Sequence, residues 1–162
     1  MKHIVLILIL LLNIAKAHSQ SLGIYSLPPF ERAACVIKHF ESIHTAKDYP
    51  YIGYGHRIQK GEHFYLPLTK QQADSLLRDD LSKLCRMFRK HTETDALLLA
   101  TLAYNVGYGR VIRSQLFKKI TSGDRDVKAD YISFCRYQGK PIPSIRMRRR
   151  IEWKVIMNRK SL

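Results

Sequence analysis

The residues with the clearest potential for chemistry lie in one short segment, from Phe40 to His56. Glu41 closes an apolar run that has helical spacing. After a few polar residues comes Ile-Gly-Tyr-Gly-His, which has the character of a strand with two glycines. Glycine inside a strand often marks a bulge or a close approach by another backbone or a ligand. A carboxylic acid at a helix end, facing a short glycine-rich hairpin, is well placed to be a general acid beside a bound polymer.

Helices are expected to hold this segment in place. Proline is tolerated in the first turn of a helix, so the run that ends at Glu41 is expected to begin near Pro28 and Pro29. Thr69 and Gln72 form a capping box, which predicts the start of an amphipathic helix. Asp80 falls on the apolar stripe of that helix and needs a partner, because burying a lone carboxylate is costly.

The rest of the chain also has a helical pattern. The run 95–106 is apolar nearly all round and is followed by glycines, which is typical of a buried central helix. A last helix is expected from about Ser144, with an apolar stripe and a cluster of arginines at its start. Shorter helices are predicted over 114–121 and 126–134, a small hairpin over about 49–64, and a loop over 139–143. The apolar stripe predicted for the last helix consists of Met147, Ile151 and Val155. The fold class is therefore mainly α with a small β-hairpin.

The first residues favour export from the cell. A positive start, a short apolar run and Ala15-Lys16-Ala17 are typical of a cleaved secretory signal peptide over residues 1–17, with an uncleaved membrane anchor as the alternative. We expect residues 18–32 to be a leader and 33–162 to be one domain. The net charge of +15, reduced by two on cleavage, predicts a polyanionic partner such as a cell wall or an anionic membrane surface. Export argues against nucleic acid, so the predicted location is the periplasm.

Three cysteines, Cys35, Cys85 and Cys135, cannot all pair within one chain. Two of them lie in apolar helical patterns, where a free cysteine behaves as a small hydrophobic residue, so we favour thiols over a disulfide. No spacing of residues suggests a metal site, and we expect no cofactor. A monomer is the default expectation.

Several segments in this order resemble the phage-type lysozymes, endolysins of glycoside hydrolase family 24. The resemblance covers about 33–157, and a branch carried by bacterial conjugative elements is similar as well. The segments that carry it are Phe40-Glu41, Gly53-Tyr54-Gly55-His56, Leu76-Leu77-Arg78-Asp79-Asp80, Asn105-Val106-Gly107, Leu116 to Asp124, and Arg148-Arg149-Arg150-Ile151-Glu152.

The resemblance implies a muramidase that cleaves peptidoglycan between N-acetylmuramic acid and N-acetylglucosamine. It implies two lobes around a cleft, with Glu41 as the general acid. It also implies that Arg146 reaches Glu41 and that His56 pairs with Asp80 to support the hairpin. Asn105 can hydrogen-bond a sugar or cap the end of its helix, and both roles can hold together.

The segment after Glu41 departs from the family pattern. It is about five residues shorter than usual, and Tyr51 stands where family members have threonine. Glycoside cleavage usually needs a second carboxylate as base or nucleophile. Asp48 can serve as that group or can simply cap a turn. Thr45 can hold a water or bond to the backbone.

Two further side chains have open roles. His44 can orient the water, act as a base or contact substrate, because imidazole changes charge near neutral pH, or it can be an ordinary surface histidine. Tyr54 can pack under a sugar or fill the hairpin.

Two other functions remain open. The chain can be a catalytically inactive lysozyme-fold protein that binds peptidoglycan or an assembly partner, which the altered segment favours. It can also be a cationic protein that perturbs anionic lipid through its basic last helix. Wall lysis and wall remodelling for conjugation are not separated by the sequence.

Overall fold

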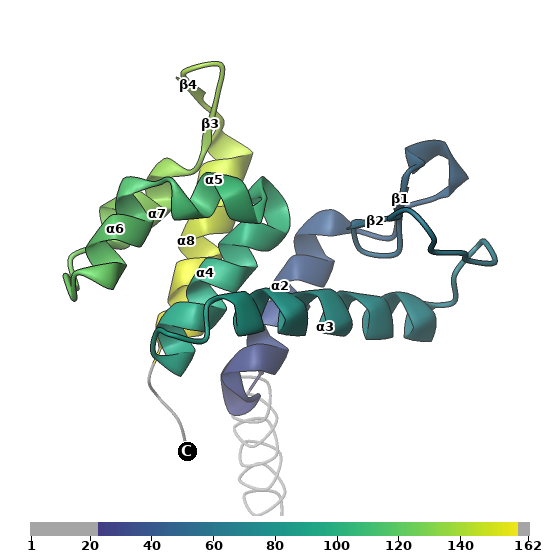
Figure 1. The fold of residues 1–162 in the computed structure, drawn as a ribbon, viewed down its shortest axis with the longest axis horizontal. Helices are drawn as coiled ribbons and strands as arrows, with labels where there is room; N and C mark the ends of the chain where they lie inside the picture. Colours follow the sequence, from purple (N-terminus) through teal and green to yellow (C-terminus); the bar gives the residue numbers. More distant parts are fainter. Residues whose placement is uncertain (1–22, 159–162) are drawn as a thin grey trace, which may run out of the picture.

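The computed structural model describes residues 23–158, and within them the chain is mostly helical with two small hairpins (Figure 1). This confirms the predicted fold class, while the division into two lobes stays a prediction. The predicted signal peptide lies outside the described residues. The elements in chain order are η1 Ile24–Ser26, α2 Pro29–Glu41, η2 Ala46–Asp48, β1 Tyr51–Ile52, β2 His56–Arg57, α3 Lys70–Met87, α4 Glu93–Val106, α5 Tyr108–Ile112, α6 Gln115–Thr121, α7 Lys128–Ser133, β3 Arg136–Tyr137, β4 Lys140–Pro141 and α8 Pro143–Met157.

Helix α4 forms the centre of the core, as its all-round apolar sequence predicts. Its residues from Asp95 to Ala103 are buried, and it packs against α2, α3, α5 and α8. Figure 1 shows α3 leading from the side of the first hairpin to α4, with α2 crossing α3 and α8 lying beside α4. The acid at the end of α2 therefore stands on a helix that is packed against both the central and the last helix.

Local signals in the sequence set the ends of these helices. The capping box at Thr69 is present, since its hydroxyl accepts from the backbone N–H of Gln72 and the Gln72 side chain accepts from Thr69. Helix α4 ends at Gly107, whose φ of 86° favours glycine. Helix α2 begins at Pro29, and the buried Arg32 donates to backbone carbonyls at the end of α8. Residues 29–32, which were assigned to the predicted leader, thus lie in the first turn of α2.

The first hairpin is shorter than the expected range. Strands β1 and β2 pair Tyr51 with Arg57 and Ile52 with His56, and an isolated bridge joins His44 to Gly53. This bridge places the residues that follow Glu41 alongside the hairpin, so the short segment between α2 and β1 packs against the end of β1.

The C-terminal third departs from the predictions in several places. Helix α5 forms where no element was predicted, and strand β4 of the second hairpin lies within the loop expected over 139–143. Helix α8 begins at Pro143 with no side-chain cap, so Ser144 is not its cap. The stripe predicted for this helix holds only in part. Val155 is buried and Ile151 is half-buried, but Met147 is 53% exposed, while Arg148, Arg149 and Glu152 are buried.

Two findings concern the membrane and the cysteines. Within residues 23–158, no helix has the length and apolar character needed to cross a bilayer. Cys35, Cys85 and Cys135 are free thiols, and burial raises the pKa of the Cys85 thiol.

An ion-pair cluster between α2 and α3 gives stability a dependence on pH. Lys38 and Arg78 both bind Asp74, at 2.6 and 2.5 Å, and these hydrogen bonds lower the pKa of Asp74. A lowered folded-state pKa stabilises the fold above the ordinary value of 3.8, and this contribution is lost as pH falls through the folded value. We expect Asp74→Asn to cost about 0.5–1 kcal/mol at pH 7 and much less near pH 3. Urea unfolding at both pH values measures this, and an equal cost at the two pH values would contradict it.

Candidate functional site

Glu41 is the last residue of α2 and lies at the centre of the candidate site. The helix stops there because Ser42 adopts a positive φ of 55°. The Glu41 side chain is 19% exposed. Its Oε1 atom accepts from Arg148 at 2.6 Å and from the amide of Asn105 at 3.4 Å. Side chains of α8 and α4 thus hold one carboxylate oxygen.

The cation on Glu41 is Arg148, which corrects the expectation for Arg146. Two residues turn a helix by about 200°, so Arg146 and Arg148 point to nearly opposite sides of α8. Arg146 is exposed, whereas Arg148 is buried and lies 5.4 Å from the centre of the Phe40 ring. Burial acts to lower the pKa of Arg148, but the carboxylates of Glu152 and Glu41 outweigh it and the pKa is raised.

A buried polar network supports this contact from behind. Glu152 accepts from Arg148 at 2.8 Å, from the hydroxyl of Tyr131 at 2.8 Å, and from Arg149. Arg149 also donates to the amide oxygen of Asn105. Glu41, Arg148, Glu152, Arg149 and Asn105 therefore form a closed ring of contacts. We call it the Glu41 ring, and it fixes both groups that hold the acid.

The other oxygen of Glu41 faces the first hairpin at Gly55. A Cβ atom on Gly55 would stand 3.7 Å from Glu41 Oε2, and 3.8 Å from the Cε1 atoms of both His44 and Tyr104. Gly55 also has a φ of 101°, which favours glycine. The glycine thus keeps a small space open between the acid, an imidazole and a phenol. Burial, with Asp80 and Glu41 nearby, raises the pKa of Tyr104, so its hydroxyl stays protonated and donates to the Tyr54 carbonyl at 3.0 Å.

Asp48 and Thr45 are joined to each other in a capping box on η2. One oxygen of Asp48 accepts from the backbone N–H of Thr45 at 2.6 Å and from its hydroxyl at 3.0 Å. These bonds lower the pKa of Asp48, with a smaller contribution from His44. Both side chains are exposed. Asp48 therefore caps the turn in the structure, as one of the two predicted roles requires. Its catalytic role stays a prediction.

His44 is held at the start of this turn by the hairpin. Its backbone N–H donates to the Gly53 carbonyl at 2.7 Å, and its ring Nδ1 lies 3.2 Å from the same oxygen. Its ring centre is 6.1 Å from that of Tyr51. Tyr51, which is 44% exposed, stands where the resemblance implies a threonine, and this position lies beside His44.

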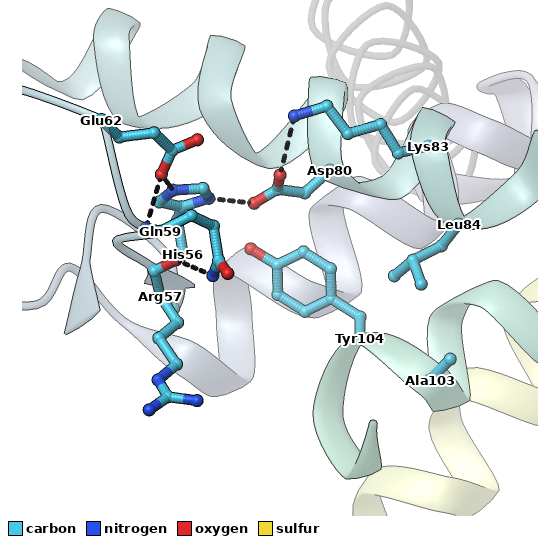
Figure 2. Close-up of a pocket in the computed structure, with 10 residues that line it drawn as sticks. His56, Arg57, Gln59, Glu62, Asp80, Lys83, Leu84, Ala103 and Tyr104 are labelled. Carbon is cyan, nitrogen blue, oxygen red and sulfur yellow. Dashed lines mark hydrogen bonds and ion pairs between the residues drawn. The ribbon is translucent and has the colours of Figure 1, made fainter. Parts of the chain in front are cut away.

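The hairpin is anchored on α3 through His56, as Figure 2 shows. The ring Nδ1 of His56 lies 2.6 Å from Asp80, and its Nε2 lies 2.8 Å from Glu62. The expected His56–Asp80 contact is therefore made, and Glu62 is a second partner that the sequence did not indicate. These three side chains and Tyr104 border a hollow of about 310 Å³ next to Gly55.

Loss of this anchor is expected to loosen the hairpin. Asp80→Asn removes the charge opposite His56, and hydrogen bonds to charged groups contribute about 1.5–3 kcal/mol. We expect a loss of about 2 kcal/mol in the free energy of unfolding, measured in urea, and faster amide exchange at Ile52 and His56. Asp79→Asn, on the neighbouring exposed carboxylate, is the matched control. Equal stability of the two variants would contradict an anchoring role.

The structure brings most of the predicted site residues together. Glu41, His44 and Asn105 lie at the site, while Tyr54 is half-buried against the core and joins it through its carbonyl. Arg148, Tyr104 and Gly55 were missed. The motif Arg-Arg-x-x-Glu carried a signal for Arg148, because i and i+4 positions share a helix face with Glu152. Within residues 23–158, no cluster of three or more histidine, cysteine or acidic side chains is arranged to hold a metal ion.

Comparisons with known proteins agree with the fold described above. A search of the curated proteins gave no match. Among solved structures, the endolysin from Escherichia coli O157:H7 phage FAHEc1 is similar, with a TM-score of 0.61 and 22% identity, covering 78% of this chain and 90% of the endolysin. The muramidase domain of SpmX from Asticaccaulis excentricus has a TM-score of 0.64 and 20% identity, covering 78% of this chain and 95% of that domain. At these identities the likeness shows the fold.

The family model described as phage lysozyme matches residues 38–152. This range contains the acid, the glycine hairpin, its anchor on α3 and the whole Glu41 ring. Because it spans well over half of the sequence, the chain belongs to the phage lysozyme family.

Proposed function

We propose that the protein is a muramidase that cleaves peptidoglycan between N-acetylmuramic acid and N-acetylglucosamine, with Glu41 as its general acid. Membership of the phage lysozyme family supports peptidoglycan hydrolysis as the general activity. The observation that carries the finer proposal is the position of Glu41, which is held on one oxygen by Arg148 and Asn105 and faces Gly55 with the other.

This geometry divides the work between the two oxygens of Glu41. Oε1 is occupied by donors and stays fixed, so Oε2 is the atom that can carry a proton toward a glycosidic oxygen at Gly55. The acid donates that proton as the bond between the sugar carbon and the oxygen breaks. A second group must then assist the attacking water, and Asp48, Thr45 and His44 are the side chains that the short segment offers.

The proposed setting is the periplasm, after removal of residues 1–17. The substrate is then the glycan of the cell wall, and the positive charge favours attraction to that anionic surface and to anionic membrane lipid. The active form is proposed to be a monomer that needs no cofactor. Wall remodelling during conjugation is one proposed context, and phage-type lysis is the other.

The test is the identification of new reducing ends. Purified peptidoglycan is incubated with the mature protein (residues 18–162), and the released ends are reduced with borohydride and analysed. New N-acetylmuramic acid ends support the proposal. New N-acetylglucosamine ends would show a different glycosidase, and new amino groups without new sugar ends would show a peptidase or amidase.

A catalytically inactive, glycan-binding protein is the second candidate. It is favoured by the Asp48 carboxylate, which is engaged in a turn, and by Tyr51 at the position of the family threonine. This function predicts that the mature protein sediments with peptidoglycan and releases no new ends over many hours. Turnover by wild type would exclude it.

A further inference from the structure

We propose that His44 is the general base that activates the attacking water, in place of the carboxylate that usually fills this role. The inference rests on the proposed muramidase function and names the second group of the same site. Three observations support it: the tautomer of the His44 ring, the position of this ring across Gly55 from Glu41, and the hydrogen bonds that already engage the Asp48 carboxylate.

The hairpin fixes the tautomer of the His44 ring. Nδ1 lies 3.2 Å from the Gly53 carbonyl, which can only accept a hydrogen bond, so Nδ1 carries the proton in the neutral ring. The lone pair then lies on Nε2, as in other histidines whose second nitrogen is held by a backbone carbonyl. The backbone bond from His44 to the same carbonyl holds the ring in this orientation.

The ring and the acid share one small space. Cε1 of His44, which is bonded to Nε2, and Oε2 of Glu41 both lie within 3.8 Å of the point that a Cβ on Gly55 would occupy. A sugar carbon bound at this opening has the acid on one side and the imidazole close by. Because Gly55 has no side chain, the space between the His44 ring and the Glu41 carboxylate is left open for a water molecule.

The chemical step balances with these two groups alone. Glu41 Oε2 gives its proton to the glycosidic oxygen, and the bond between that oxygen and the sugar carbon breaks with its electron pair on the oxygen. A water oxygen bonds to the sugar carbon while its proton passes to His44 Nε2. The imidazolium then returns a proton through solvent, and Glu41 takes one up.

Asp48 is less suited to the same role. Its Oδ2 already accepts two hydrogen bonds from Thr45, and these bonds lower its pKa, which weakens it as a base. We assign it instead to the turn that carries His44. The charged and titratable groups on the elements around His44 are Lys47 and Asp48 of η2, Glu41 of α2, Tyr51 of β1 and Tyr104 of α4, with Arg148 of α8 behind Glu41.

The experiment compares four proteins on purified peptidoglycan: wild type, His44→Gln, Asp48→Asn and the control His39→Gln. His39 is an exposed histidine near the end of α2, outside the site. We expect His44→Gln to lower kcat/KM by about 10²–10³-fold, with glycan binding unchanged within about threefold. His39→Gln keeps the wild-type rate, and Asp48→Asn stays within about tenfold of it.

Two further readouts separate a base from a structural residue. The kcat/KM profile of wild type against pH is expected to have an acid limb, and the profile of His44→Gln is expected to lack it. Added imidazole restores part of the activity of His44→Ala. A rate within tenfold of wild type for His44→Gln, or a loss in Asp48→Asn that equals or exceeds that of His44→Gln, would overturn the assignment. If neither wild type nor His39→Gln turned over peptidoglycan, the result would instead overturn the proposed muramidase function.

Discussion

Glu41→Gln is expected to lower peptidoglycan turnover by at least about 10³-fold, since general acid catalysis contributes about 10²–10⁴-fold and the amide has no proton of suitable acidity. The fold is expected to survive. The amide oxygen can still accept from Arg148 and Asn105, and Arg148 keeps its bond to Glu152. We therefore expect a loss of only about 1 kcal/mol in the free energy of unfolding. Turnover is followed by new reducing ends, and stability by urea unfolding.

Glu93→Gln is the matched control for this variant. Glu93 is exposed and lies at the opposite end of α4 from Asn105, so the control removes the same charge far from the site. It is expected to keep the wild-type rate. A Glu41→Gln protein that retains a tenth or more of the wild-type turnover would show that another group protonates the leaving oxygen.

The largest effect on stability is expected from Glu152→Gln. Glu152 and Arg149 are fully buried, and the Arg148 side chain is only 7% exposed. Removing the carboxylate leaves two buried guanidinium groups with too little compensating charge, and breaking a buried pair costs about 3–5 kcal/mol. For a chain of this length we expect Tm to fall by roughly 10–15 °C. Thermal unfolding followed by circular dichroism measures this change.

The same variant is expected to lose activity below its Tm. With a neutral amide at position 152, Arg148 and Arg149 lose the carboxylate that pairs with them, so the support of both donors to Glu41 Oε1 is weakened. Tyr131→Phe removes only a neutral donor to Glu152 and is the graded comparison. A decrease in Tm for Glu152→Gln no larger than that for Tyr131→Phe would contradict the importance of the charge.

Much of the site could be predicted from short motifs. The Phe-Glu pair at a helix end, the glycine hairpin and Asp80 on an apolar stripe each depend on neighbours in sequence or on helical spacing. These features led to Glu41, to the hairpin and to the His56–Asp80 contact. The helices with clear caps were also predicted well, as Thr69 and Gly107 show.

The interior of α8 could not be predicted in the same way. Its inward face is built from Arg148, Arg149 and Glu152, so a search for apolar spacing selected Met147, which is exposed. Arginine is buried here because carboxylates meet it, Glu152 from α8 itself and Glu41 from α2. The pattern of α8 contains the first of these partners and not the second. Arg146 was implied by the family resemblance, and the turn of the helix points it away from Glu41.

The short segment after Glu41 was difficult for a different reason. The spacing between the catalytic residues that the family pattern implies does not occur in this segment. The positions of His44 and of the turn that follows it also depend on the bridge between His44 and Gly53, which forms only in the folded hairpin. The Thr45–Asp48 capping box is local, but its sequence alone did not distinguish a cap from a catalytic acid.

The tie between the two ends of the domain has a consequence for biosynthesis. Arg32 on α2 reaches the carbonyls of Val155 and Asn158, and Glu41 reaches Arg148, so the helix that carries Glu41 is completed by contacts with α8 and the residue that follows it. During synthesis the nascent chain holds Glu41 long before it holds the groups that orient it. A nascent chain that stops before α8 therefore contains Glu41 without the side chain of Arg148 that holds its carboxylate.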